Sequence, residues 1–294
     1  MQSDYRNTPA FETIRPRRQS APLVFNSPHS GRDYPHRFLA MTRLDHRSIR
    51  QSEDAYVDEI FARAPHMGAP LLKANFPRAY LDANREPYEL DPAMFSDRLP
   101  KECNVTSARV AAGLGTLARI VAEGKPIYRE KLTLSDARMR IEGIYRPYHA
   151  QLQKLLTDTA NQFGVAVLVD CHSMPSTAGH RDERPRPEFV LGDRYGTSCA
   201  AELTDLCAQI LARRGYSVTR NKPYAGGFIT EHYGQPARGL HAMQIEVNRS
   251  LYMDERTLET HDGFLQLSAD LAHLVRELGT AFEAGFLSRP EAAE

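Results

Sequence analysis

Short apolar runs alternate with longer amphipathic stretches along the chain. The run at 165–170 is apolar up to its final aspartate and rich in β-branched residues, which is typical of a central strand covered on both faces. Similar runs predict strands at 22–26, 70–74, 78–81, 188–191, 216–220 and 241–247. Apolar positions at helical spacing predict helices at 53–64, 135–163, 198–213 and 261–282.

Two of these predicted helices carry details of their own. The helix at 135–163 contains Pro147, near which we expect a tolerated break. In the helix at 261–282 we expect five leucines to face the core: Leu265, Leu267, Leu271, Leu274 and Leu278.

The alternation of strands with helices predicts an α/β fold, with a mixed, mostly parallel sheet and helices on both faces. We expect a single catalytic domain over residues 22–288, after an N-terminal leader at 1–21 and before a C-terminal tail at 289–294. In such sheets functional groups gather beyond the carboxyl ends of strands. Nearly every polar cluster in this chain follows a predicted strand, so we expect one site at one edge of the sheet.

The charge balance favours a small-molecule partner. The 37 basic residues cancel the 37 acidic ones, which argues against nucleic acid or an anionic membrane surface as the partner. No stretch reaches the ~18 apolar residues of a membrane span, and the N-terminal residues lack the apolar core of a secretory signal. We therefore expect a cytoplasmic protein.

The four cysteines lie scattered, with no C-x-x-C pair among them. This spacing argues against a disulfide framework and against a structural zinc knuckle. Cys171 stands beside His172 at the end of a predicted strand, where a small buried residue is more common than a nucleophile.

Two histidines share one local context. His29 and His172 each follow an apolar run, and each precedes a serine. Catalytic zinc commonly takes three protein ligands from histidine and carboxylate and keeps a fourth position open. The matched contexts therefore favour a metal site over two separate structural histidines.

The third metal ligand stays open at this point. The carboxylates nearest to His29 in sequence are Asp33, Glu53, Asp54 and Asp58. Asp33 belongs to a polar turn, whereas Glu53 and Asp54 begin a predicted helix. We favour Asp54, with Glu53 as the alternative.

A second carboxylate has the setting of a general base. Glu246 lies between apolar neighbours on a predicted strand, where the two-residue period places it on the same side as Gln244 and Asn248. A carboxylate beside an attacking water is what a general base for amide hydrolysis requires. The alternative is the solvated face of an edge strand.

Arginines supply candidate sites for substrate carboxylates. Asn84 and Arg85 combine an amide with a guanidinium that can bind a carboxylate through two hydrogen bonds. Arg138 and Arg140, near the start of a predicted helix, are candidates for a second carboxylate, although a solvated helix face is the ordinary explanation for at least one of them.

Five motifs occur in one order between residues 22 and 255. They are Ser27-Pro28-His29-Ser30-Gly31 through Tyr34-Pro35, Asp82-x-Asn84-Arg85-x-Pro87, Asp170-Cys171-His172-Ser173-Met174-Pro175, Asn221-x-Pro223-Tyr224-x-Gly226-Gly227 and Gln244-Ile245-Glu246-x-Asn248-Arg249. With these motifs the chain resembles the N-formylglutamate amidohydrolase family, a branch related to the zinc carboxypeptidases and succinylglutamate desuccinylases.

The resemblance implies a carboxypeptidase-like (phosphorylase/hydrolase-like) α/β fold and one Zn²⁺ per chain. It implies that His29 and His172 bind this zinc, that Glu246 is the general base, and that the Asn84-Arg85 pair holds the substrate's α-carboxylate. The H-x-x-E ligand pair of the carboxypeptidase relatives has no counterpart, because residue 32 is an arginine. We also expect Arg138 and Gly227 to contact the substrate.

The implied reaction is zinc-dependent hydrolysis of N-formyl-L-glutamate to formate and L-glutamate. One alternative keeps this mechanism for another N-acyl amino acid. A second is a catalytically silent ligand-binding protein on the same scaffold. A third is a cysteine hydrolase that uses Cys171 with His149 or His241.

Overall fold

The computed structural model describes residues 8–121, 124–177 and 187–286. Contacts along the chain divide it into two compact units, each built from three segments. The first unit comprises Met1–Glu12, Pro28–Glu53 and Lys73–Gln151, and the second comprises Thr13–Ser27, Asp54–Leu72 and Leu152–Glu294. The boundaries expected for leader, catalytic domain and tail stay predictions, and residues 289–294 lie outside the described part of the chain.

A seven-stranded sheet organises the fold. Its strands, in sheet order, are β1 Phe11–Ile14, β3 Leu71–Ala74, β2 Leu23–Ser27, β4 Ala166–Met174, β7 Leu240–Asn248, β5 Phe189–Gly192 and β6 Val218–Arg220. The pairs β2 with β4, β4 with β7 and β5 with β6 are parallel, whereas β5 pairs antiparallel with β7. The expected mixed, mostly parallel sheet is confirmed.

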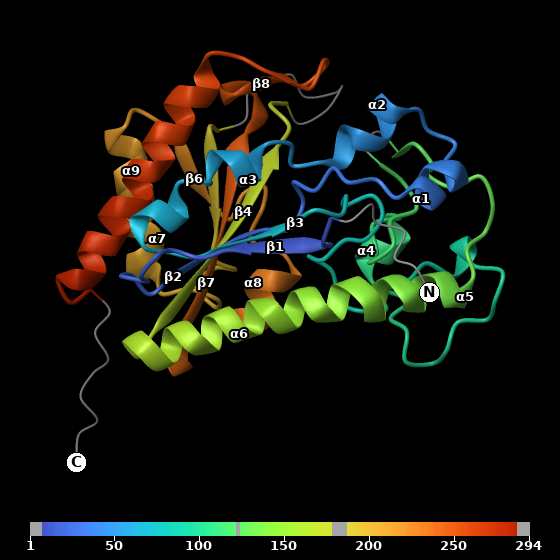
Figure 1. Ribbon diagram of the computed structural model, residues 1–294, viewed down its shortest axis with the longest axis horizontal. Helices are drawn as coiled ribbons and strands as arrows, with labels where there is room; N and C mark the ends of the chain where they lie inside the picture. The colour runs from blue at the N-terminus through green and yellow to red at the C-terminus, as the bar shows by residue number, and fades with distance from the viewer. Residues whose placement is uncertain (1–7, 122–123, 178–186, 287–294) are drawn as a thin grey trace. The chain divides into compact units, whose positions relative to one another are not determined.

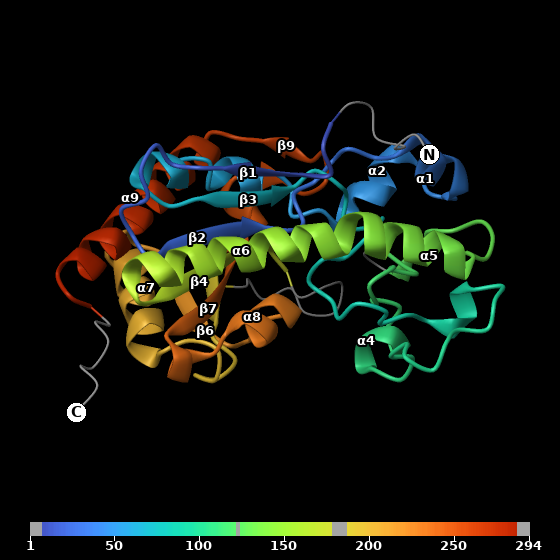
Figure 2. The same cartoon turned by 60° about the horizontal axis from the view of Figure 1, so that its bottom comes forward.

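The helices alternate with these strands along the chain. They are α1 His36–Met41, α2 His46–Ile49, α3 Val57–Ile60, α4 Ala108–Ala111, α5 Leu134–Arg140, α6 Arg146–Phe163, α7 Ala201–Arg213, α8 Phe228–Tyr233 and α9 Gly263–Glu283. A short hairpin, β8 Met253–Asp254 with β9 Glu259–Thr260, precedes α9. In Figures 1 and 2, α7 and α9 lie on one side of β4 and β7, and α8 lies on the other.

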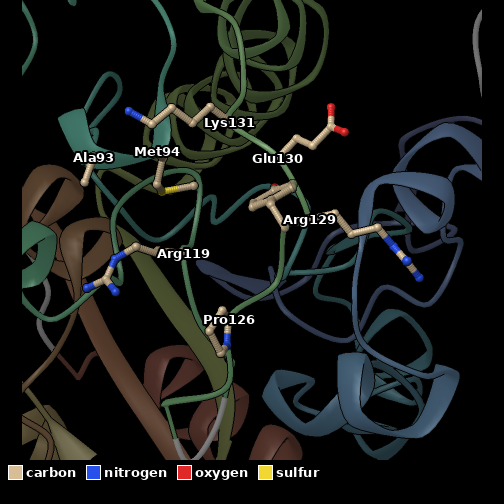
Figure 3. Close-up of a pocket in the computed structure, with 8 residues that line it drawn as sticks. Ala93, Met94, Arg119, Pro126, Arg129, Glu130 and Lys131 are labelled. Carbon is tan, nitrogen blue, oxygen red and sulfur yellow. The ribbon is translucent and has the colours of Figure 1, made fainter.

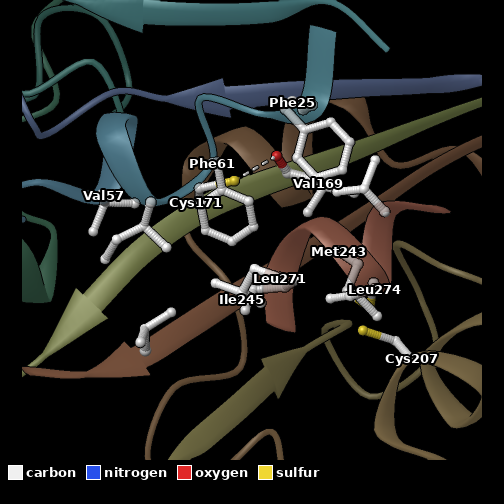
Figure 4. Close-up of a cluster of buried hydrophobic side chains, with 14 of the residues drawn as sticks. Phe25, Val57, Phe61, Val169, Cys171, Cys207, Met243, Ile245, Leu271 and Leu274 are labelled. Carbon is white, nitrogen blue, oxygen red and sulfur yellow. Dashed lines mark hydrogen bonds between the residues drawn. The ribbon is translucent and has the colours of Figure 1, made fainter. Parts of the chain in front are cut away.

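The hydrophobic core of the second unit follows from strand alternation. On each central strand every second residue is apolar and packs against α3, α7 and α9, as Figure 4 shows for Val169, Cys171, Met243 and Ile245. The residues between them face the opposite side of the sheet. Alternation thus separates an apolar face from a face that carries the polar residues.

Some sequence predictions are wrong, each for a local reason. Residues 78–81 form a turn, in which the Tyr80 and Leu81 amides donate to the Pro77 carbonyl. Within 53–64 only one α-helical turn, α3, forms, because Tyr56 takes a left-handed conformation (φ 64°). Strand β1 lies within the expected leader, whose boundary stays a prediction.

The prediction for the last helix is wrong at one position. Leu267, Leu271, Leu274 and Leu278 are buried on one face of α9, whereas Leu265 is 73% exposed. Two residues correspond to about 200° around an α-helix, so Leu265 and Leu267 point in opposite directions.

The expected break near Pro147 is a π-helical turn, Ile141–Tyr145, which joins α5 to α6 without interrupting the helix.

Candidate active site

Strands β4 and β7 pair in parallel, and their register aligns the polar residues on one face of the sheet. His172 pairs with Glu246, and Asp170 pairs with Gln244, so these four side chains lie on one side of two adjacent parallel strands. Glu246 is only 7% exposed, and β7 lies between β4 and β5. The alternative of a solvated edge strand is therefore wrong.

Two carboxylates hold the ring of His172. Its Nδ1 lies 2.9 Å from Asp54 Oδ2, and its Nε2 lies 2.8 Å from Asp170 Oδ2. Asn26 Nδ2 donates to the other oxygen of Asp170 at 2.7 Å and fixes that carboxylate. Burial works against protonation of His172, but the charges of Asp170 and Asp54 outweigh it, so the pKa of the ring stands well above its ordinary value.

Asp54 sits in a buried polar cluster of the second unit. It lies just before α3, and its Oδ1 accepts hydrogen bonds from Ser173 Oγ and from Arg249 Nη2, both at 3.3 Å. Arg249 Nε also donates to Ser173 Oγ at 3.0 Å. Because Oδ1 is held in this way, Oδ2 is directed toward His172.

In the first unit, His29 has its own carboxylate partner. His29 follows β2 by two residues, and its Nε2 lies 2.7 Å from Asp82 Oδ1. Asp82 Oδ2 accepts from Arg78 Nε at 3.0 Å. Burial favours the neutral acid, but the charges of Arg85, His29 and Arg78 hold the pKa of Asp82 well below its ordinary value.

His29, Asp54 and His172 form a candidate metal site. Each offers one ligand atom, all three residues are buried, and these atoms lie within 4.8 Å of one another. The chemistry of this donor set fits a divalent cation, since two imidazoles and one carboxylate are common zinc ligands. In each histidine the other ring nitrogen contacts a buried carboxylate, Asp82 or Asp170, the usual partner of a metal-bound imidazole.

The alternative third ligand, Glu53, is engaged elsewhere. Both of its oxygens accept from Arg50 at 3.0 to 3.1 Å, and Oε1 also accepts from Tyr34 Oη at 2.6 Å. The structure therefore groups Asp54, and not Glu53, with the two histidines.

Gln244 links Glu246 to the glycine-rich loop. Its Nε2 donates to Glu246 Oε1 at 2.7 Å, and its Oε1 accepts from the backbone N–H of Gly227 at 3.0 Å. Gly192 leaves room for this loop, because a Cβ at Gly192 would stand 2.7 to 2.9 Å from backbone atoms of Ala225 and Gly226. The hydrogen bond to Gln244 therefore fixes the backbone of Gly227, while the contact of Gly227 with substrate stays a prediction.

Comparison with known proteins decides the family. The model of the N-formylglutamate amidohydrolase family matches residues 21–253. The chain belongs to this family. It is 32% identical to the N-formylglutamate deformylase of Pseudomonas aeruginosa over 251 residues. This aligned region spans 83% of this chain and 87% of that relative.

Two further similarities agree with this assignment. The N-formylglutamate deformylase of Pseudomonas putida is 32% identical over 240 residues, or 80% of this chain and 82% of that relative. The crystal structure of N-formylglutamate amidohydrolase from Ralstonia eutropha JMP134 superposes with a TM-score of 0.88 at 36% identity, and covers 94% of this chain and 99% of that one. The candidate metal site accordingly belongs to a family of metal-dependent amidohydrolases.

The arginines expected to bind substrate have different surroundings in this family member. Arg85 is largely buried, and its Nε and Nη1 donate at 2.8 Å to the carbonyls of Leu114 and Asn84. Arg138 is exposed on α5. Arg140 is buried, with its guanidinium 4.1 Å from the centroid of the Tyr80 ring. The roles of Arg85 and Arg138 stay predictions.

Cys171 lies on the opposite face of β4 from His172. It is fully buried against the hydrophobic core, as Figure 4 shows. Burial and the charge of Asp170 raise the pKa of its thiol well above the ordinary value. His149 and His241 contact backbone atoms of Ala83 and Ala200. This setting does not favour a cysteine nucleophile.

A cavity of about 480 Å³ opens in the first unit, and Figure 3 shows its lining. The lining residues are Ala93, Met94, Arg119, Pro126, Tyr128, Arg129, Glu130 and Lys131. They include none of the residues predicted for the site.

Among the described helices, none has the length and apolar character needed to cross a membrane.

Proposed function

We propose that the protein hydrolyses N-formyl-L-glutamate to formate and L-glutamate, with one Zn²⁺ bound by His29, Asp54 and His172. The observation that carries this proposal is the buried His-Asp-His cluster, with Glu246 in register beside His172. The similarity to N-formylglutamate deformylases supports the choice of acyl group and amino acid. When bound, zinc would polarise the formyl carbonyl and lower the pKa of a water molecule to ~7.

Glu246 is the proposed general base and acid. It accepts a proton from the attacking water and returns it to the nitrogen as the C–N bond breaks, so the products are formate and the free amine of glutamate. Gln244 holds Oε1 of Glu246. This contact orients the carboxylate that is proposed to transfer the proton.

Arg85 is proposed to bind the α-carboxylate of the substrate, with Asn84 beside it. A guanidinium offers five N–H donors, and Nε and Nη1 of Arg85 donate to carbonyl oxygens. We assign Nη2 to the substrate. The exposed Arg138 and the backbone of Gly227 are proposed as further substrate contacts.

The test is a panel of N-formyl, N-acetyl and N-succinyl amino acids, assayed for release of the free amine by the zinc-loaded protein. N-formyl-L-glutamate should be hydrolysed with the highest kcat/KM. Preference for another acyl group or amino acid would keep the mechanism and change the substrate. No release from any of the amides, at full zinc occupancy, would contradict the proposal.

Glu246→Gln sharpens this test, because glutamine keeps the shape of glutamate but cannot accept the proton. The variant should retain zinc and its melting temperature, while kcat falls by a factor on the order of 10² to 10⁴. A kcat within a few-fold of wild type would give Glu246 a structural role instead.

A further inference from the structure

The π-helical turn between α5 and α6 has a local cause in Pro147. Proline lacks an N–H, and its ring clashes with the carbonyl four residues earlier, which here belongs to Gly143. A π turn replaces that contact, since Arg146 N–H donates to the Ile141 carbonyl five residues back. The helix therefore continues through Pro147 with one additional residue in a single turn.

The additional residue changes which side chains share a face. In a regular α-helix, Arg140 and Tyr145 are five residues apart and would point about 140° away from each other. Across a π turn, residues five apart come close to alignment. Tyr145, the last residue of the π turn, and His149 on α6 are four residues apart, and their ring centroids lie 4.2 Å from each other.

The aligned face contacts one short segment, residues 80–85, which forms neither helix nor strand. Three side chains of the helix bind three of its carbonyls: Arg140 Nη1 to Tyr80 at 3.0 Å, Tyr145 Oη to Arg85 at 2.7 Å, and His149 Nε2 to Ala83 at 2.9 Å. Such carbonyls have no strand partner, so side-chain donors satisfy them. The same segment carries Asp82, Asn84 and Arg85.

We propose that Tyr145, supported by Arg140 and His149, is a positioning residue for substrate recognition. By fixing the backbone of residues 80–85, it presets the guanidinium of Arg85 for the α-carboxylate of the substrate. A preset site binds more tightly because less conformational freedom is lost on binding. The choice of ligand in this inference rests on the proposed function. The claim that Tyr145 fixes the backbone of residues 80–85 does not depend on it.

Tyr145→Phe removes the hydroxyl and keeps the ring. The matched control is Tyr88→Phe, because the Tyr88 hydroxyl also contacts this helix but donates to the Glu142 side chain at 2.7 Å. Hydrogen exchange measures directly how firmly the backbone of residues 80–85 is fixed. It is read by mass spectrometry on peptides of the full-length protein that cover this segment. Exchange there should speed up at least about fivefold in Tyr145→Phe and stay unchanged in Tyr88→Phe, while zinc content stays at wild-type level in both.

The second readout is ligand affinity. In zinc-loaded Tyr145→Phe, KM for N-formyl-L-glutamate and Kd for L-glutamate should both rise about tenfold, since the partly buried Arg85 carbonyl loses its donor. The turnover number kcat should change less than KM. Should Tyr145→Phe fail to fold, His149→Phe applies the same test, because it keeps a ring against Tyr145 and removes the bond to Ala83.

The outcomes separate the two claims. Unchanged exchange at residues 80–85 overturns the inference whatever the activity. Faster exchange with KM and Kd unchanged in an active enzyme also overturns it, because the segment would then not set substrate affinity. Faster exchange in a protein that hydrolyses no N-acyl amino acid supports the holding role and removes the proposed function.

Discussion

At the scale of single residues, the orientation of the two candidate histidine ligands depends on buried carboxylates. Asp82 contacts His29, and Asp170 contacts His172, at 2.7 and 2.8 Å. Each contact fixes the orientation of the ring, as a carboxylate partner does for a metal-bound imidazole. Removing either aspartate would loosen the ring it holds.

The sequence predicts the three residues of the candidate metal site, but not the carboxylates that contact the two rings. His29 and His172 share a recognisable context, and Asp54 was favoured over Glu53 as the third ligand. Asp82 lies 53 residues from His29 in sequence, so its contact depends on the tertiary fold. The signal that could have found it is the motif it begins, Asp82-x-Asn84-Arg85.

Paired substitutions test the choice of third ligand. Asp54→Ala should lower zinc content well below one per chain, because the site loses its carboxylate. Glu53→Ala should keep full zinc, because Glu53 binds Arg50 and Tyr34. Metal analysis of the two purified variants checks this. Full zinc in Asp54→Ala together with loss in Glu53→Ala would transfer the role to Glu53.

At the scale of elements, the two-residue period of β7 was enough to predict which residues share a face. Its parallel register with β4 was not predictable from either strand alone, because it depends on pairing between segments more than 70 residues apart. The sequence predicts a strand at residues 78–81, where the structure has a turn, since a short apolar run does not distinguish a strand from a buried turn. Leu265 breaks the predicted core face of α9, because the helical period places it in solvent.

Substitutions on the two faces of α9 test which of its leucines belong to the core. Leu271→Ala should lower the free energy of unfolding by about 2 to 5 kcal/mol, because it opens a cavity in the core. Leu265→Ala should change it by less than about 0.5 kcal/mol, since that side chain is already in solvent. Urea denaturation compares the two. Equal losses would place Leu265 in a contact that the structure does not contain.

At the scale of the whole molecule, all four cysteines are buried thiols. Burial raises the pKa of each of them, that of Cys199 to about 12. Because thiolates are the reactive form, native protein should react slowly with iodoacetamide and keep its activity, whereas a strong chelator should remove that activity. Loss of activity in step with alkylation of Cys171, with chelation harmless, would favour the cysteine hydrolase.

The central claim is that one metal ion, held by His29, Asp54 and His172, serves amide hydrolysis in this family member. Titration of metal-depleted protein with Zn²⁺, while glutamate release from N-formyl-L-glutamate is followed, tests it most directly. Activity should rise linearly, level off at about one equivalent per chain, and stay at background in His172→Ala at the same zinc concentrations. Full activity without metal, or the same titration curve in His172→Ala, would contradict the account.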